Sequence, residues 1–178
     1  MRHIPNIISV LRILLVVPIA LALKNQQLAL SIGLFVIAGA SDAADGFLAR
    51  RFGWQSELGG ILDPIADKLL LATAFVTLSF LKLVPLWLMV AAVARDVIIV
   101  SGAAAYRIFI GRLTAHPSLV SKLNTLCQGA FIVAVLSRAK FSLPPGPVIW
   151  LGALVFAMVV VSGIDYVLVY GRRAAAAA

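Results

Sequence analysis

The sequence predicts an all-α integral membrane protein with six transmembrane helices, and three observations lead to this class. The first is composition, since 62% of the 178 residues are hydrophobic and only 12% are charged, whereas a soluble domain carries about 25% charged residues. The second is a series of apolar segments, each near the roughly 20 residues needed to cross a bilayer. The third is the polar or proline-containing sequence that separates these segments.

Each predicted helix ends at a recognisable break. Polar residues 24–27 follow the first, a glycine and a capping serine lie within 51–56, Pro85 follows the third, and 111–117 and 142–147 form the last two links. We therefore expect helices at residues 4–23, 28–51, 57–82, 85–109, 118–138 and 146–170. Residues 1–173 then form a single membrane domain. The alanine run 174–178 is a low-complexity tail that we expect to fray.

The basic residues predict the orientation of the six spans, which place both termini on one side. Eight arginines and lysines fall on that side: Arg2, Arg50, Arg51, Arg107, Arg112, Lys122, Arg172 and Arg173. Four fall on the other: Lys24, Lys82, Arg138 and Lys140. By the positive-inside rule, the chain is expected to be a multi-pass protein of the inner (cytoplasmic) membrane, with both termini in the cytoplasm.

The net charge of +8 does not indicate nucleic-acid binding. A nucleic-acid-binding domain would need a basic soluble surface or a stacking platform, and the apolar composition leaves neither. The charge suits an anionic membrane surface and phosphate-bearing substrates.

Four aspartates stand out within the second and third predicted helices. Asp42 and Asp45 are three residues apart, and Asp63 and Asp67 are four apart, so each pair shares one face of its helix. Because these helices meet at the cytoplasmic turn 52–56, we expect the pairs to oppose one another just below that membrane surface. Such an oxygen-rich pocket suits hard divalent cations and phosphoryl transfer. The alternative is a buried polar network or a solvated helix end, but four acids without paired bases would repel one another unless a cation were bound.

The surrounding residues extend this quartet into a longer pattern. It reads Asp42-x2-Asp45-Gly46-x2-Ala49-Arg50-x8-Gly59-x3-Asp63-x3-Asp67. This pattern resembles the signature of the CDP-alcohol phosphotransferases, also called CDP-alcohol phosphatidyltransferases, which are membrane enzymes of phospholipid synthesis. Residues 5–12 resemble the opening helix of that family, and 62–68 resemble its phosphatidylglycerophosphate and cardiolipin synthase branch.

The resemblance implies a role for each motif residue. Asp42, Asp45, Asp63 and Asp67 would bind two Mg²⁺ or Mn²⁺ ions, and Asp67 would also act as general base on the acceptor hydroxyl. The implied CDP-binding residues are Asp45, Gly46, Ala49, Arg50, Gly59 and Asp63. The small residues would let the nucleotide approach the helix backbone, and Arg50 would bind the pyrophosphate. Close helix packing is the alternative, compatible reason for the small residues.

Basic residues of the fourth and fifth predicted helices and of the link between them are candidates for binding the acceptor: Arg95, Arg112 and Lys122. Arg95 lies within the membrane and would bind an acceptor phosphate, or else pair with a motif aspartate or Asp165. Asp96 is not expected to be its partner, because adjacent helix residues do not face each other. The alternatives for Arg112 and Lys122 are a solvated positive-inside charge and a snorkelling side chain, respectively.

The resemblance predicts transfer of a phosphatidyl group from CDP-diacylglycerol to a phosphate-bearing alcohol, with release of CMP. Glycerol 3-phosphate is the first expected acceptor. Phosphatidylglycerol, giving cardiolipin, is a nearly equal alternative, because Arg95-Asp96 and residues 121–125 look more like cardiolipin synthases. Phosphatidylglycerophosphate synthases usually show arginine-glutamate at the first place and a glycine-lysine-x-lysine-threonine pattern at the second. The resemblance also implies a homodimer. A divalent-cation transporter and a structural membrane subunit are the competing classes, and CMP release distinguishes the enzyme from both.

Overall fold

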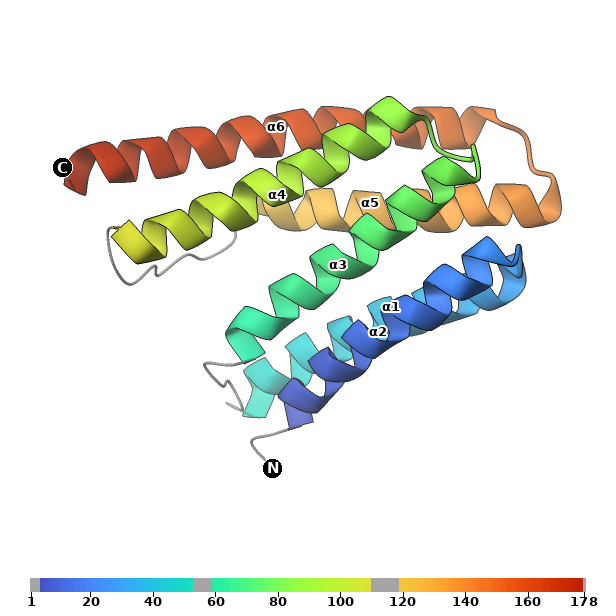
Figure 1. Cartoon of the computed structure of the whole chain (residues 1–178), viewed down its shortest axis with the longest axis horizontal. Coiled ribbons are helices and arrows are strands. Elements are labelled where there is room, and N and C mark those ends of the chain that lie inside the picture. Colours follow the sequence, from blue (N-terminus) through green and yellow to red (C-terminus); the bar gives the residue numbers. More distant parts are fainter. Residues whose placement is uncertain (1–3, 53–58, 110–118, 178) are drawn as a thin grey trace. The chain divides into compact units, whose positions relative to one another are not determined.

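The computed structural model describes residues 4–52, 59–109 and 119–177, and over these residues the chain forms six α-helices and no strand (Figure 1). The helices are α1 (Ile4–Lys24), α2 (Leu28–Phe52), α3 (Gly59–Phe80), α4 (Leu86–Phe109), α5 (Leu119–Phe141) and α6 (Gly146–Ala177). Side chains are described for residues 10–41, 65–102 and 119–168. The all-α prediction is confirmed for this part of the chain.

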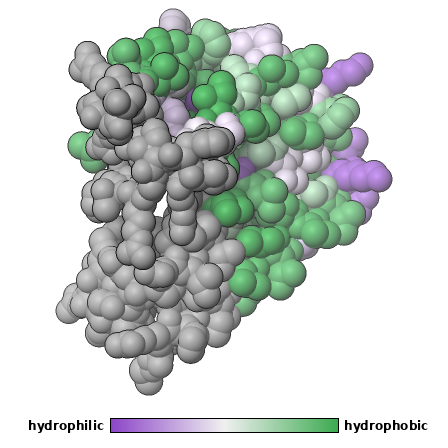
Figure 2. Space-filling model, turned by 60° about the vertical axis from the view of Figure 1, so that its left-hand side comes forward, coloured by the Kyte–Doolittle hydropathy of each residue, from purple (hydrophilic) through white to green (hydrophobic). Residues whose placement is uncertain are grey.

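The outer surface of the described helices is strongly apolar. Leu14, Leu119 and Trp150 are at least 65% exposed, and Figure 2 shows that the described part of one face is largely hydrophobic. Leu119–Phe141 and Gly146–Leu168 are long and apolar enough to cross a membrane, and Leu28–Ser41 is a shorter apolar segment. These features indicate association with a membrane, whereas six spans stay a prediction.

The chain divides into two compact units, of which the first comprises Met1–Val84 and Ile132–Pro144. Within it, α1 packs against both α2 and α3. The buried face of α1 follows the helical repeat and consists of Arg12, Val16, Ile19, Ala22 and Leu23. On α3 one row of buried residues recurs every four positions, at Ala66, Leu70, Ala74 and Leu78, and Leu71 and Phe75 beside it are also buried. A charged residue thus occupies one position of an otherwise apolar face.

The second unit comprises Pro85–Phe131 and Pro145–Ala178, and within it α4 packs against α6. A glycine permits a close approach here. A Cβ placed on the buried Gly152 of α6 would lie 3.3 Å from Phe131 and 3.8 Å from Leu88. Trp87 and Phe156 meet edge to face nearby, with ring centroids 5.2 Å apart.

Three helices end in the same way, at a residue with left-handed backbone. The residues are Gln26, Lys82 and Ser142, with φ between 53° and 57°. After α1, the Gln27 amide donates to the Ala22 carbonyl and the Gln26 amide to the Leu23 carbonyl, which is the Schellman arrangement. Lys82 closes α3 with the same pair of bonds. These caps satisfy carbonyls that would otherwise lack a partner at the helix end.

The helix boundaries agree with the predicted ones to within three residues, apart from the end of α6. The alanine run that we expected to fray is helical through Ala177, because alanine has the strongest helix propensity of all residues. The prediction of one domain over residues 1–173 stays a prediction.

Candidate active site

The two aspartate pairs lie on consecutive helices. α2 contains Asp42 and Asp45 near its end, and α3 contains Asp63 and Asp67 near its start. The side chains of Asp42, Asp45 and Asp63 are outside the described residues. That the two pairs face each other across a metal site therefore stays a prediction. The backbone spacing still places each pair on one helix face.

Asp67, the proposed general base, is described in full. Its side chain is 29% exposed, and Oδ1 accepts a hydrogen bond of 2.6 Å from Nη1 of Arg12 on α1. Arg12 itself is 1% exposed and belongs to the buried face of α1. A short, charge-assisted bond therefore joins a buried guanidinium to an accessible carboxylate.

The other residues of the motif are placed by backbone alone. Gly46, Ala49 and Arg50 lie in the last turns of α2, and Gly59 is the first residue of α3. Their side chains, like that of Asp45, are outside the described residues. The CDP-binding assignments therefore stay predictions.

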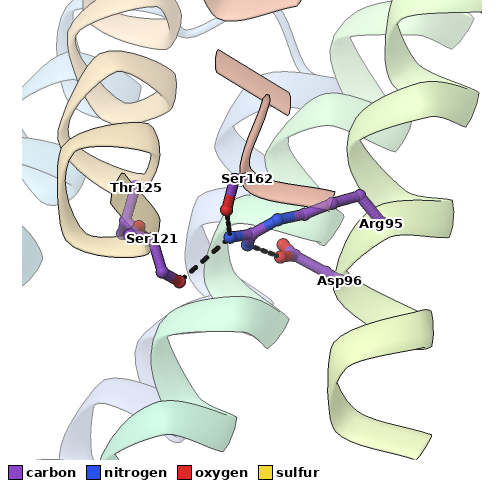
Figure 3. A network of polar contacts seen from close by, with 5 residues as sticks. All are labelled: Arg95, Asp96, Ser121, Thr125 and Ser162. Carbon is purple, nitrogen blue, oxygen red and sulfur yellow. Dashed lines mark hydrogen bonds and ion pairs between the residues drawn. The ribbon is translucent and has the colours of Figure 1, made fainter. Parts of the chain in front are cut away.

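A second polar cluster, the Arg95 cluster, lies within the second unit (Figure 3) and comprises Arg95, Asp96, Ser121 and Ser162. Arg95 on α4 donates from Nη1 to Asp96 Oδ1 at 2.6 Å and from Nη2 to Ser121 Oγ on α5 at 2.9 Å. Nη2 also donates to Ser162 Oγ on α6. The guanidinium, in a residue 5% exposed, thereby joins three helices.

The expectation that Asp96 would not pair with Arg95 was wrong. Arg95 Nη1 and Asp96 Oδ1 form an ion pair of 2.6 Å, and the side chains of Asp42, Asp45 and Asp63 are outside the described residues. Adjacent residues do leave a helix in different directions, but the arginine side chain is long enough to bring its guanidinium back to a neighbouring carboxylate. Within this cluster the charge of Arg95 is consequently balanced by its own neighbour.

The three acceptor candidates have different environments. Arg95 is buried and Lys122 is exposed, while Arg112 is outside the described residues. Lys122 follows Ser121 directly, so the Arg95–Ser121 bond brings the start of α5 to Arg95. A hydrogen bond thus links the helix segments that contain Arg95 and Lys122.

Two buried amides continue the polar face of α5 beyond Ser121. Asn124 and Gln128 follow at intervals of three and four residues, and they are 0% and 1% exposed. Among the described residues, Asn124 Oδ1, Asn124 Nδ2 and Gln128 Nε2 have no hydrogen-bond partner. Because unpaired buried polar groups cost about 1–3 kcal/mol each, this face suits a polar ligand or water.

Sequence reasoning assigned no role to Arg12, Asn124, Gln128 or Ser162. The available signal was a polar side chain inside an apolar helix, which marks a functional candidate by default. For Ser121, Asn124 and Gln128 there was also the helical spacing of one face. The partner of Arg12, 55 residues away on α3, had no such signal in the sequence.

Comparison with known proteins agrees with these features. The sequence model for CDP-alcohol phosphatidyltransferases matches residues 2–166. Human cardiolipin synthase (CMP-forming) is 31% identical over 155 residues, which cover 78% of this chain and 52% of that protein. A probable phosphatidylglycerophosphate synthase of Mycobacterium tuberculosis is 30% identical over 172 residues, 93% of this chain and 80% of its own.

A CDP-diacylglycerol–glycerol-3-phosphate 3-phosphatidyltransferase of Pseudomonas fluorescens is 44% identical over 80 residues, 43% of this chain and 40% of that protein. The chain spans about half the length of the cardiolipin synthases that it matches. The family match covers nearly all of the sequence, including the aspartate pattern of α2 and α3, and the chain therefore belongs to the CDP-alcohol phosphatidyltransferase family.

Proposed function

We propose that this protein transfers a phosphatidyl group from CDP-diacylglycerol to a phosphate-bearing glycerol acceptor and releases CMP. The observation that carries the proposal is the family match over residues 2–166. The Asp67 carboxylate, accessible and bound by a buried arginine, supports it. Enzymes of this family transfer phosphatidyl groups, and its relatives here are named for that chemistry.

The reaction replaces a pyrophosphate bond at the phosphorus with a phosphate ester bond. The acceptor hydroxyl oxygen forms a bond to the phosphorus that bears the diacylglycerol, and the bond from that phosphorus to the bridging pyrophosphate oxygen breaks. The bridging oxygen leaves as part of CMP. Asp67 accepts the hydroxyl proton, which then passes to solvent or to the departing phosphate.

The family depends on divalent metal ions, and we propose two Mg²⁺ or Mn²⁺ ions bound by Asp42, Asp45, Asp63 and Asp67. The described part of this set fits such an ion, because Asp67 presents a partly exposed carboxylate and oxygen donors suit hard cations. The ions would neutralise charge on the attacking and leaving oxygens. Arg50, Gly46, Ala49 and Gly59 would hold the CDP portion beside them.

Glycerol 3-phosphate is the first candidate acceptor, with Lys122 and Arg112 as its proposed phosphate ligands and Arg95 as the residue that organises the site. A relative that aligns with 93% of the chain is named a probable phosphatidylglycerophosphate synthase. The product would then be phosphatidylglycerophosphate.

Phosphatidylglycerol is the second candidate, and the Arg95 cluster favours it. The charge of Arg95 is balanced by Asp96, and the buried side chains that follow Ser121 are neutral amides. Such a site offers hydrogen bonds more than net positive charge, which suits a singly charged phosphodiester better than a dianionic phosphate monoester. The product would then be cardiolipin.

The proposed setting is the cytoplasmic membrane, crossed six times, with the aspartates and both termini on the cytoplasmic side. The apolar helices and exposed apolar side chains support a membrane location, and the basic residues support the orientation. A homodimer is proposed from the family alone.

Product analysis tests the proposal directly. Purified protein would be incubated with CDP-diacylglycerol and Mg²⁺, with glycerol 3-phosphate or phosphatidylglycerol in parallel, and CMP and lipid products would be identified by mass spectrometry. We expect CMP release that requires an acceptor and stops with chelator. A metal-free preparation with full activity would refute the metal assignment, and no CMP with either acceptor would refute the proposed reaction. Divalent-cation transport by the same preparation in vesicles would instead support the transporter class.

A further inference from the structure

The ion pair of Arg12 with Asp67 has a feature that packing alone does not require. The buried face of α1 is otherwise formed by Val16, Ile19, Ala22 and Leu23, and a further aliphatic residue would continue it. Replacing a buried ion pair by apolar residues is often neutral or stabilising. The presence of arginine at this position therefore calls for a reason beyond helix association.

The geometry supplies a reason, because the bond fixes the carboxylate of Asp67. The aspartate side chain has two rotatable bonds, and a hydrogen bond at Oδ1 from a buried guanidinium restrains both. Since the two oxygens belong to one rigid group, fixing Oδ1 also fixes the direction of Oδ2. The side chain remains 29% exposed, so the restrained group is accessible.

We propose that Arg12 is a positioning residue, which orients the Asp67 carboxylate for its work on the acceptor hydroxyl and the metal ion. This inference rests on the proposed function. In this role Arg12 acts through Asp67. Arginine suits the task better than lysine, because its planar, rigid donor group fixes an angle as well as a distance.

The decisive variant is Arg12→Lys, which keeps the charge but loses the planar donor group. We expect kcat for CMP release, per folded molecule, to fall about 10- to 100-fold, as misplacement of a reacting group by about an ångström does. The KM values for CDP-diacylglycerol and acceptor should stay within about twofold, because no substrate-binding group is changed. The control is Arg138→Lys, an exposed arginine in the last turn of α5, which should leave kcat unchanged.

A purely structural role gives a different result. If Arg12 only holds α1 to α3, Arg12→Lys should lower the melting temperature in detergent while the folded fraction keeps its kcat. That outcome would overturn the proposal, as would a loss expressed only in KM. Should Arg12→Lys yield too little folded protein, Arg12→Gln, which keeps a hydrogen-bond donor without the charge, gives the same comparison.

Metal binding gives a readout that needs no activity. Mn²⁺ affinity would be measured by electron paramagnetic resonance in the wild-type protein and in Arg12→Gln. By charge alone, removal of a cation beside a carboxylate should tighten Mn²⁺ binding, whereas loss of orientation should weaken it. We expect binding at least about threefold weaker, which would cost roughly 0.7 kcal/mol.

Unchanged or tighter Mn²⁺ binding would contradict the proposal. If the wild-type protein releases no CMP with either acceptor, the proposed function fails, but the Mn²⁺ comparison still decides whether Arg12 orients Asp67.

Discussion

Asp67 has two functions that a single substitution removes together, since it binds the buried Arg12 and is the proposed base. We predict that Asp67→Asn abolishes CMP release and also lowers the melting temperature in detergent, because a buried guanidinium then loses an anionic partner. Asp63→Asn should likewise abolish activity, through loss of a proposed metal ligand. Substantial CMP release by both variants would refute the catalytic assignment.

Lys122 and Arg95, two candidates for binding the acceptor, differ in burial, so their substitutions should affect different properties. Lys122 is exposed, so Lys122→Ala should raise the KM for the acceptor several-fold without changing the melting temperature. Arg95 is 5% exposed and bound to Asp96, so Arg95→Ala should cost about 3–5 kcal/mol of folding free energy, because it removes one partner of a buried ion pair. A rise in the KM of CDP-diacylglycerol alone in Lys122→Ala would place the acceptor elsewhere.

A double substitution tests whether the Arg95 cluster serves stability or the reaction. In Arg95→Met/Asp96→Leu both charges are replaced by apolar groups, so the stability lost in Arg95→Ala should largely return. Acceptor use should not return, because the hydrogen bonds that organise the start of α5 are gone. Thermal unfolding and acceptor KM would be measured on the same preparations. Recovery of both would show that the cluster has no part in acceptor binding.

At the scale of single residues, the sequence predicted the candidate functional residues better than it predicted which residues they pair with. The aspartate spacing follows from the helical repeat and needs no tertiary information. The pairing of Arg12 with Asp67 depends on how α1 packs on α3, and the pairing of Arg95 with Asp96 depends on a side-chain conformation. Neither is encoded in a local pattern.

At the scale of the helices, Gly152 of α6 lies at a close packing contact. Its Cβ position is 3.3 Å from Phe131, so Gly152→Leu should force apart well-packed side chains at a cost of about 1–3 kcal/mol. Gly129 of α5 is the matched control, because nothing lies within 4 Å of its Cβ position. Gly129→Leu should leave the melting temperature unchanged or raise it. Equal effects of the two substitutions would contradict this packing.

The helices themselves were largely predictable, because long apolar runs and polar breaks mark them. Their ends were less so. The third helix was expected to continue to residue 82 but ends at Phe80, because Lys82 takes the left-handed conformation that closes the cap. The alanine run was expected to fray because of its terminal position. It is helical through Ala177 because alanine has a high helix propensity.

At the scale of the whole molecule, the predicted six spans have a consequence that labelling can check. In a Cys127→Ser background, Gln26→Cys and Ser142→Cys should react with a membrane-impermeant maleimide applied from outside the cytoplasmic membrane. Arg172→Cys should react only after the membrane is opened, since both termini are expected in the cytoplasm. Equal labelling of all three in intact cells would contradict the orientation.

The three left-handed caps also provide a practical route to a more thermostable preparation. Gln26, Lys82 and Ser142 each hold a backbone conformation that costs a residue with a side chain about 1–2 kcal/mol and glycine almost nothing. Replacing all three by glycine would relieve that strain in the folded state, partly offset by the greater freedom of glycine in the unfolded chain. Under the proposed topology these caps lie at the membrane face opposite the aspartates, so the chemistry would be left untouched while the protein gained resistance to heat and detergent.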